Sequence, residues 1–188
     1  MKATSILKEE HRNMLRALNV IDGITARVEN GEMADANDVE SVLKFLQCYG
    51  DYYHQEREES VLFPALLKAS HSKEYEELCA ISFEHNRERS LIEGIRESVL
   101  TRRACDFVYY SHRLSELMRA HIKTEEEGVF RRADAVFDEA ADECVMQELV
   151  RYDSPNQDWK LATLGCLAAL EARYVPHPNA TAEKAHSA

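Results

Sequence analysis

His54-Gln-Glu-Arg-Glu58 and His121-Ile-Lys-Thr-Glu125 repeat one pattern 67 positions apart, in which a glutamate follows a histidine by four residues. On an α-helix, residues four apart lie on the same face, with about 5–6 Å between their Cβ atoms. Each stretch therefore directs an imidazole and a carboxylate the same way from one helix. A second acid, Glu59 or Glu126, directly follows each pair. The repeat predicts two equivalent helices that each carry ligand-type side chains.

Two more histidines, His11 and His85, lie within apolar stripes that have helical spacing. Apolar residues recur in this way from Leu7 to Ile21 and again across residues 78–95. Such stripes face the core of a helical protein, so both histidines occupy core-facing positions. The pattern thus predicts two helical hairpins, each with one lone histidine and one histidine–glutamate pair.

We predict four long helices, over about residues 4–30, 35–61, 73–100 and 104–129, joined by short loops. This pattern predicts an all-α fold, an up-down-up-down four-helix bundle with additional C-terminal helices.

The helix ends are predicted from capping and breaking residues. Thr4 or Ser5 is expected to cap the first helix, and Asp35 or Asn37 the second. Pro64 is expected at or beyond the end of the second helix, because proline interrupts the backbone hydrogen-bond ladder.

Beyond the bundle, the periodicity predicts a short helix over 138–150 and a fifth long helix over 157–174. We divide the chain into a bundle at 1–135, a helical extension that packs on it at 136–175, and a disordered tail at 176–188. His177 and His186 lie in the tail and are not expected to be ligands.

The composition excludes several classes of function. Charged residues make up 30% of the 188, and the net charge is −11, which disfavours nucleic acid and anionic membranes as partners. There is no apolar run near the roughly 18 residues that a membrane span needs, and no apolar signal peptide. We therefore expect a cytoplasmic protein, either a monomer or a homodimer. The five cysteines are spread singly and are expected to be small core residues.

A lone histidine on an apolar stripe is usually a hydrogen-bonded core residue, and one histidine–glutamate pair can be a surface ion pair. Here four successive helices each direct a histidine into the same interior, and two of them add a glutamate. An apolar interior cannot bury four imidazoles and two carboxylates without compensation, because an unpaired buried charge costs several kcal/mol. Metal ions supply that compensation. The predicted metal ligands are His11, His54, Glu58, His85, His121 and Glu125.

The donor types narrow the choice of metal. Imidazole and carboxylate without thiolate disfavour structural zinc, and four histidines are too many for calcium or magnesium. Two iron ions fit this donor set best, with manganese or a mixed pair as the alternative.

The motifs resemble the hemerythrin-like family, also called the HHE cation-binding domain. The resemblance covers about residues 5–132 and rests on His11, His54-x-x-x-Glu58-Glu59-x-x-Leu62-Phe63-Pro64, Glu84-His85 and His121-x-x-x-Glu125-Glu126. It implies a non-haem di-iron centre with an oxo or hydroxo bridge. Glu58 and Glu125 would bridge the irons, and the four histidines would be terminal ligands. Members of the family carry oxygen, sense oxygen or iron, or act on nitric oxide and peroxide.

One position departs from the oxygen-carrying members, which have a second histidine four residues after the equivalent of His85. Here that position is Arg89. If each iron seeks about six donors, the ligand set leaves two positions open, which favours a ligand that engages both metals. Arg89 would donate hydrogen bonds to such a ligand, or else pair with Glu93 one turn away. Glu88 is the alternative source of an extra carboxylate ligand.

These observations predict a di-iron protein that binds or reacts with peroxide, oxygen or nitric oxide in redox or nitrosative stress. Whether it is an oxidoreductase stays open. The alternatives are an oxygen carrier, an iron or oxygen sensor, and an iron donor similar to the iron–sulfur cluster repair proteins. A metal-free interaction bundle is disfavoured by the buried charge. The residues expected to support the metal ligands from behind are Arg89, Glu59, Glu126 and Tyr110.

Overall fold

The computed structural model describes residues 2–71 and 74–176. Its helical elements are α1 (Thr4–Glu29), α2 (Ala36–Phe45), two π-helical segments (Leu46–Gln55 and Glu58–Leu62), α3 (Phe63–Ala69), α4 (Tyr75–Leu100), α5 (Ala104–Thr124), a third π-helical segment (Glu125–Phe130), α6 (Arg131–Val136), α7 (Glu139–Asp153), a 3₁₀ turn (Ser154–Asn156) and α8 (Gln157–Tyr174). These residues contain no strand, and the predicted all-α class is confirmed.

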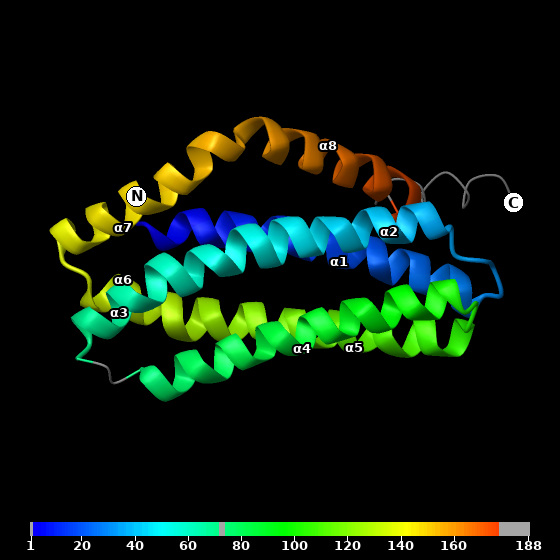
Figure 1. Cartoon of the computed structure of the whole chain (residues 1–188), viewed down its shortest axis with the longest axis horizontal. Helices are drawn as coiled ribbons and strands as arrows, with labels where there is room; N and C mark the ends of the chain where they lie inside the picture. The colour runs from blue at the N-terminus through cyan, green and yellow to red at the C-terminus, as the bar shows by residue number, and fades with distance from the viewer. Residues whose placement is uncertain (1, 72–73, 177–188) are drawn as a thin grey trace, which may run out of the picture.

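The elements form four antiparallel rods (Figure 1). The first rod is α1 and the third is α4. The second rod runs from α2 through two π-helical segments to α3, and the fourth runs from α5 through one π-helical segment to α6. The chain passes up and down alternately through these rods, so the predicted up-down-up-down bundle is confirmed. α7 and α8 lie along one side of the bundle and return toward the far end of α1.

Two helix starts illustrate how local sequence sets the rods. Asp35 caps α2 as predicted, and its side chain accepts hydrogen bonds from the backbone N–H groups of Asn37 and Asp38. The predicted cap at Thr4 is wrong, because Thr4 is already helical and its hydroxyl donates to Asp134 of α6 at 2.7 Å. A tertiary contact has therefore replaced the local cap.

The predicted end of the second helix is also wrong, because the rod continues through Pro64 to Ala69. Just before Pro64, the Phe63 N–H bonds to the Glu58 carbonyl, in the wider spacing of a π-turn. Proline has no N–H, and it is tolerated where a new helical segment begins with its own hydrogen-bond register. The π-turn makes Pro64 the second residue of α3 rather than a break in one continuous α-helix.

The apolar core is divided in two along the bundle. One buried cluster includes Met14 and Ile92, and the other includes Leu7 and Leu78. His11 and His85 fall between these positions on α1 and α4 respectively. A buried polar layer therefore separates two apolar clusters that hold the four rods in register.

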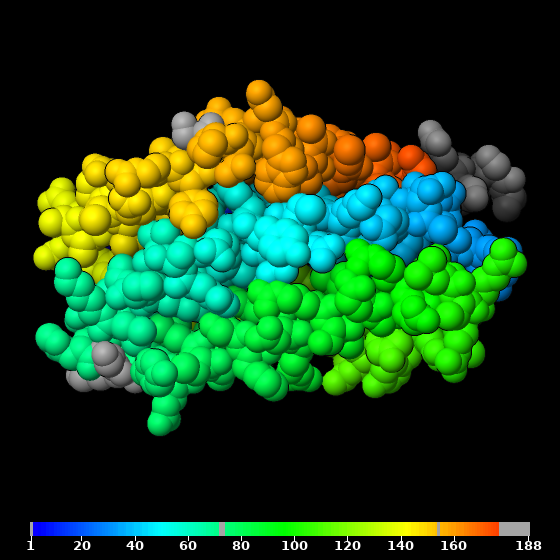
Figure 2. All heavy atoms as spheres, viewed as in Figure 1, coloured from blue at the N-terminus to red at the C-terminus, as the bar shows by residue number. Residues whose placement is uncertain are grey.

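The C-terminal extension packs on α1 and the second rod, and Figure 2 shows α7 and α8 packed along one face of the bundle. Arg16 of α1 forms two hydrogen bonds with Glu171 of α8, at 2.9 and 2.6 Å. Arg173 donates to Asp38 of α2 at 2.7 Å. The predicted tail at 176–188, with His177 and His186, lies outside the described residues from position 177 onward.

The cysteine prediction is wrong: Cys48 is half-buried and the other four cysteines are exposed on outer helix faces. No helix in the described part of the chain has the length and apolarity that a membrane crossing requires.

Gly23→Ala is expected to loosen α8 from α1. A Cβ at Gly23 would lie 2.3 Å from the carbonyl oxygen of Tyr174, which is backbone and cannot rotate away. We expect a loss of about 1–3 kcal/mol in the free energy of unfolding, although alanine is the better helix former.

Gly165→Ala is the matched control, since nothing lies within 4 Å of its Cβ position. It should raise stability by about 0.5–1 kcal/mol. Urea denaturation measures both variants, and equal effects would contradict the close packing of α1 and α8.

Candidate metal centre

The polar layer contains all six side chains that the sequence pattern selects as ligands. They come from all four rods, and each is at most 2% exposed. His11 lies on α1 and His85 on α4. The remaining four occupy the second and fourth rods, where they lie in or next to the π-helical segments: His54, Glu58, His121 and Glu125. Short π-helical insertions are frequent at functional sites, where they adjust the direction of side chains.

The histidines form two pairs. The rings of His11 and His54 are 4.6 Å apart between centroids, and those of His85 and His121 are 4.8 Å apart, both edge to face. Each pair joins the two rods of one hairpin. The centre therefore has two halves with the same composition, as the repeated sequence pattern predicts.

The two glutamates lie between the histidine pairs. Glu125 places Oε2 3.1 Å from His11 Nε2, and Oε1 3.3 Å from His121 Nε2. Glu58 places Oε1 3.4 Å from His54 Nε2, and Oε2 3.8 Å from His85 Nε2. Each carboxylate thus presents one oxygen to each pair. This is the arrangement needed to bridge two cations.

A carboxylate lies behind every histidine. Nδ1 of His54 pairs with Glu10 at 3.0 Å, and Nδ1 of His121 with Glu84 at 2.9 Å, each within one hairpin. Across the hairpins, the Nδ1–carboxylate pairs are His11 with Glu126 at 3.0 Å and His85 with Glu59 at 2.7 Å. Because an ionised carboxylate only accepts, each Nδ1 carries the proton and each Nε2 offers a lone pair to the interior. Metal-binding histidines are commonly held in this way.

The inward-facing atoms require a positive partner. His85 Nε2 and His121 Nε2 lie 3.1 Å apart, so two lone pairs face each other when both rings are neutral. Both oxygens of Glu58 and of Glu125 are buried without a hydrogen-bond partner, as are Nε2 of His11 and of His54. A buried, unpaired charge costs several kcal/mol. Metal cations satisfy all of these atoms at once, and the imidazole and carboxylate donors suit iron or manganese.

The electrostatics show the same demand for positive charge. Burial lowers the pKa of His54, but the charge of Glu58 and the hydrogen bond to Glu10 outweigh it and raise the pKa to about 10. Burial also lowers the pKa of His121, yet Glu125 raises it to about 11. A metal ion that binds here would replace the protons that these carboxylates otherwise attract.

One side of the centre is linked to the C-terminal extension. Glu10 accepts from both His54 and Arg57, and Arg57 is fully buried with its guanidinium 4.6 Å from the ring centre of Tyr53. Lys160 of α8 donates to the Tyr53 hydroxyl at 3.1 Å and lies 3.9 Å from Glu10. The extension therefore contributes a cation to the network behind His54.

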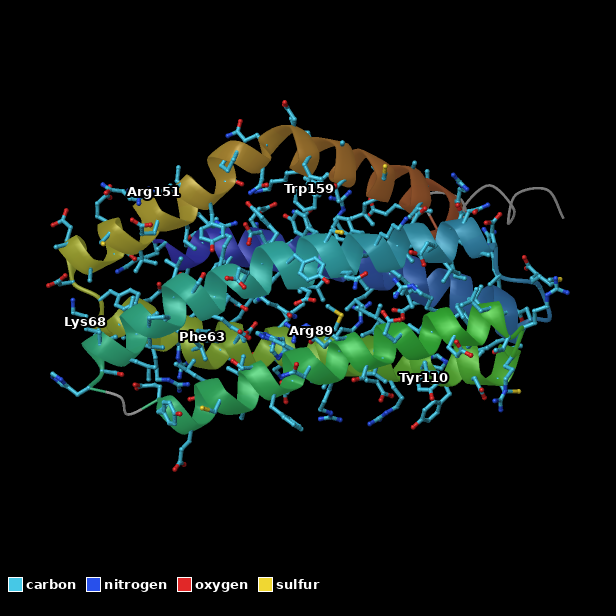
Figure 3. The ribbon with its side chains drawn as sticks, in the orientation of Figure 1. Phe63, Lys68, Arg89, Tyr110, Arg151 and Trp159 are labelled. Carbon is cyan, nitrogen blue, oxygen red and sulfur yellow. The ribbon has the colours of Figure 1, made fainter. Side chains whose placement is uncertain are left out.

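The four predicted supporting residues divide into two groups. Glu59 and Glu126 hold His85 and His11, as described above. Arg89 instead turns outward, and its Nη2 donates to Asp51 of the second rod at 2.6 Å rather than to Glu93. Figure 3 shows Arg89 between the second rod and α4, and Tyr110 near the N-terminal end of α5.

Tyr110 packs against Gly94, where a Cβ would lie 2.7 Å from its ring. Neither Arg89 nor Tyr110 forms a hydrogen bond with a predicted ligand among the described residues.

Sequence reasoning did not assign a role to Glu10 or Glu84, which hold His54 and His121. A signal was present, because Glu10-His11 and Glu84-His85 repeat the same dipeptide at the same place in each hairpin. The partner of each glutamate, however, is the histidine on the neighbouring rod rather than the adjacent one. Only the packing of the rods reveals this pairing.

A family model matches the part of the chain that contains this centre. The model of the hemerythrin HHE cation-binding domain matches residues 2–133, which include all six inward-facing side chains. No significant match was found among curated proteins or among solved structures. The match covers more than half of the chain, and its range ends within α6, so the α7–α8 extension lies beyond it. The chain belongs to the hemerythrin HHE cation-binding domain family.

Proposed function

We propose that this chain is a non-haem di-iron protein that reacts with peroxide, oxygen or nitric oxide during oxidative or nitrosative stress. The observation that carries the proposal is the convergence of four histidine Nε2 atoms on two buried carboxylates without hydrogen-bond partners. The cation-binding family and the candidate metal groups support it.

The residues have distinct parts in this proposal. His11 and His54 would hold one ion, and His85 and His121 the other. Glu58 and Glu125 would bridge the two. Bound iron would supply the one-electron redox chemistry that no side chain here provides. The protein would fix the donors, exclude water through the apolar clusters on both sides of the layer, and hold each Nδ1–H in a hydrogen bond to a carboxylate.

The identity of residue 89 bears on reactivity. It is an arginine that pairs with Asp51, and no fifth imidazole stands at this position, where oxygen-carrying relatives have one. The donor set of the centre therefore differs from that of an oxygen carrier. This favours reaction over reversible carriage. We also propose a cytoplasmic location, supported by the free state of all five cysteines.

Metal analysis and stopped-flow spectroscopy test the proposal. We expect about two irons per chain after expression with ample iron. The reduced protein should oxidise on mixing with oxygen, and its spectrum should change on addition of peroxide or nitric oxide.

Two outcomes would contradict the proposal. One is zinc, or no metal, in protein expressed with ample iron. Two manganese ions per chain would change the identity of the metal but not the ligands. The other is reversible uptake of oxygen without oxidation of the iron, which would identify an oxygen carrier.

A further inference from the structure

The internal repeat gives the centre two equivalent sides, one between the second rod and α4 and the other between the fourth rod and α1. On the first side, four neighbouring positions hold what we call the polar quartet: Asp51, Gln55, Glu88 and Arg89. Counted from the equivalent histidines, the other side has these apolar residues: Met118, Ile122, Met14 and Leu15. The internal repeat is therefore broken beside the metal centre, between the second rod and α4.

The polar quartet has an outer and an inner pair. The outer pair is Arg89 with Asp51, where the guanidinium donates at 2.9 and 2.6 Å and the arginine side chain is 42% exposed. The inner pair is Gln55 with Glu88, where the amide donates to Oε2 at 2.7 Å and both side chains are buried. The buried carboxylate of Glu88 has a methionine, Met14, as its counterpart on the other side.

Glu88 has one oxygen that nothing in the protein satisfies. Its Oε1 is buried and has no hydrogen-bond partner. Burial raises the pKa of Glu88, while the nearby charges of His121 and His85 act to lower it. An unsatisfied buried carboxylate oxygen is costly, and the equivalent methionine shows that the bundle packs without it. A cation at this side of the centre would satisfy it.

The two histidine pairs also differ in how closely their donor atoms gather. His11, His54, Glu58 and Glu125 offer ligand atoms that all lie within 4.8 Å of one another, whereas His85 and His121 form such a group with Glu125 alone. Glu58 Oε2 lies 3.8 Å from His85 Nε2 but is not part of that second group. Glu88 follows His85 by three residues and lies on the same face of α4. It is not part of this group, but the charges of His121 and His85 act on its carboxyl.

We propose that Glu88 is a further carboxylate ligand of the metal ion held by His85 and His121, with Gln55 fixing its second oxygen. The inference rests on the proposed two-metal centre and adds a ligand to one of its two ions. Glu88 would occupy the position that becomes free because Arg89 replaces a histidine, and its free oxygen moves toward the ion while Gln55 retains the other. The ion held by His11 and His54 is then the more open one for the incoming small molecule.

Cobalt(II) titration of the metal-free full-length chain tests this inference, because cobalt is a spectroscopic probe of coordination number. Wild type should bind two ions. Glu88→Gln should bind one ion as wild type does and the other about 10–100-fold more weakly. Its visible absorption per cobalt should rise, since a lower coordination number gives stronger bands. Gln55→Leu should lower the affinity for the same ion by a smaller factor.

Glu97→Gln, on the exposed face of α4, is the matched control and should behave as wild type. Thermal unfolding of metal-free Glu88→Gln separates a ligand from a structural residue, because removing an unsatisfied buried charge should not lower the melting temperature.

The inference is overturned if Glu88→Gln binds two cobalt ions with wild-type affinity and shows an unchanged spectrum. It is also overturned if the affinities for both ions fall equally. If wild type itself binds fewer than two ions, the proposed di-metal centre fails first.

Discussion

Glu58→Ala and Glu125→Ala are each expected to abolish stable binding of both metal ions. Each carboxylate presents one oxygen to His11 or His54 and the other to His85 or His121, so its removal takes a ligand from both ions. Affinity should fall by more than the roughly 10–100-fold that loss of a supporting carboxylate causes.

Glu59→Ala and Glu126→Ala are the matched comparison. These acids follow the bridging pair directly, but they contact Nδ1 on the outer side of His85 and His11 and are about one-third exposed. Their loss should release the rings without removing a ligand, so metal is retained but bound more weakly. Metal content after dialysis against a mild chelator measures all four variants. Equal loss of metal from all four variants would show that the bridging carboxylates are assigned wrongly.

Metal removal is expected to cause the largest change in stability. A ligand that binds only the folded state contributes about 4 kcal/mol when its free concentration is a thousand times its Kd, and two sites contribute twice that. For a chain of this size each kcal/mol corresponds to about 2–4 °C in Tm, so metal-free protein should melt at least about 15 °C lower. The reason is that the metal-free layer buries the unpaired oxygens of Glu58 and Glu125.

Differential scanning calorimetry of the loaded and chelator-treated protein measures this difference. Adding iron(II) or manganese(II) back to the chelator-treated sample should restore the higher Tm, whereas Glu58→Ala should show little response to either. A melting temperature that does not depend on metal would mean that the polar layer is stable by itself, and the buried-charge argument would then fail.

Much of the fold follows directly from local patterns in the chain. The apolar stripes around His11 and His85 predict two of the rods, and the repeated histidine–glutamate pairs predict the facing positions of the other two. The range of α8 matches the predicted helix at 157–174. These features depend on contacts between residues three or four apart, which the sequence displays. The convergence of six ligand-type side chains on one interior is predicted for the same reason.

Other features depend on which rods become neighbours. Nothing in the sequence shows that Arg89 would pair with Asp51, 38 positions away, rather than with Glu93 one turn along its own helix. The end of the second rod was mispredicted because the rule for proline assumes an uninterrupted α-helix, whereas a π-turn precedes Pro64. In both cases the deciding interaction is not among those that helical spacing describes.

The sequence by itself thus determined the four rods and the set of inward-facing histidines and glutamates, because these follow from helical periodicity. Its motifs carried the resemblance to the family. Only the tertiary structure decided what stands behind each ligand and beside the centre. The pairing of Glu10 with His54, the contact of Lys160 with Tyr53, and the hydrogen bond from Gln55 to the buried Glu88 all join different helices. The physical reason is that a buried charge takes its partner from whichever helix packs against it, and packing partners are set by the whole bundle.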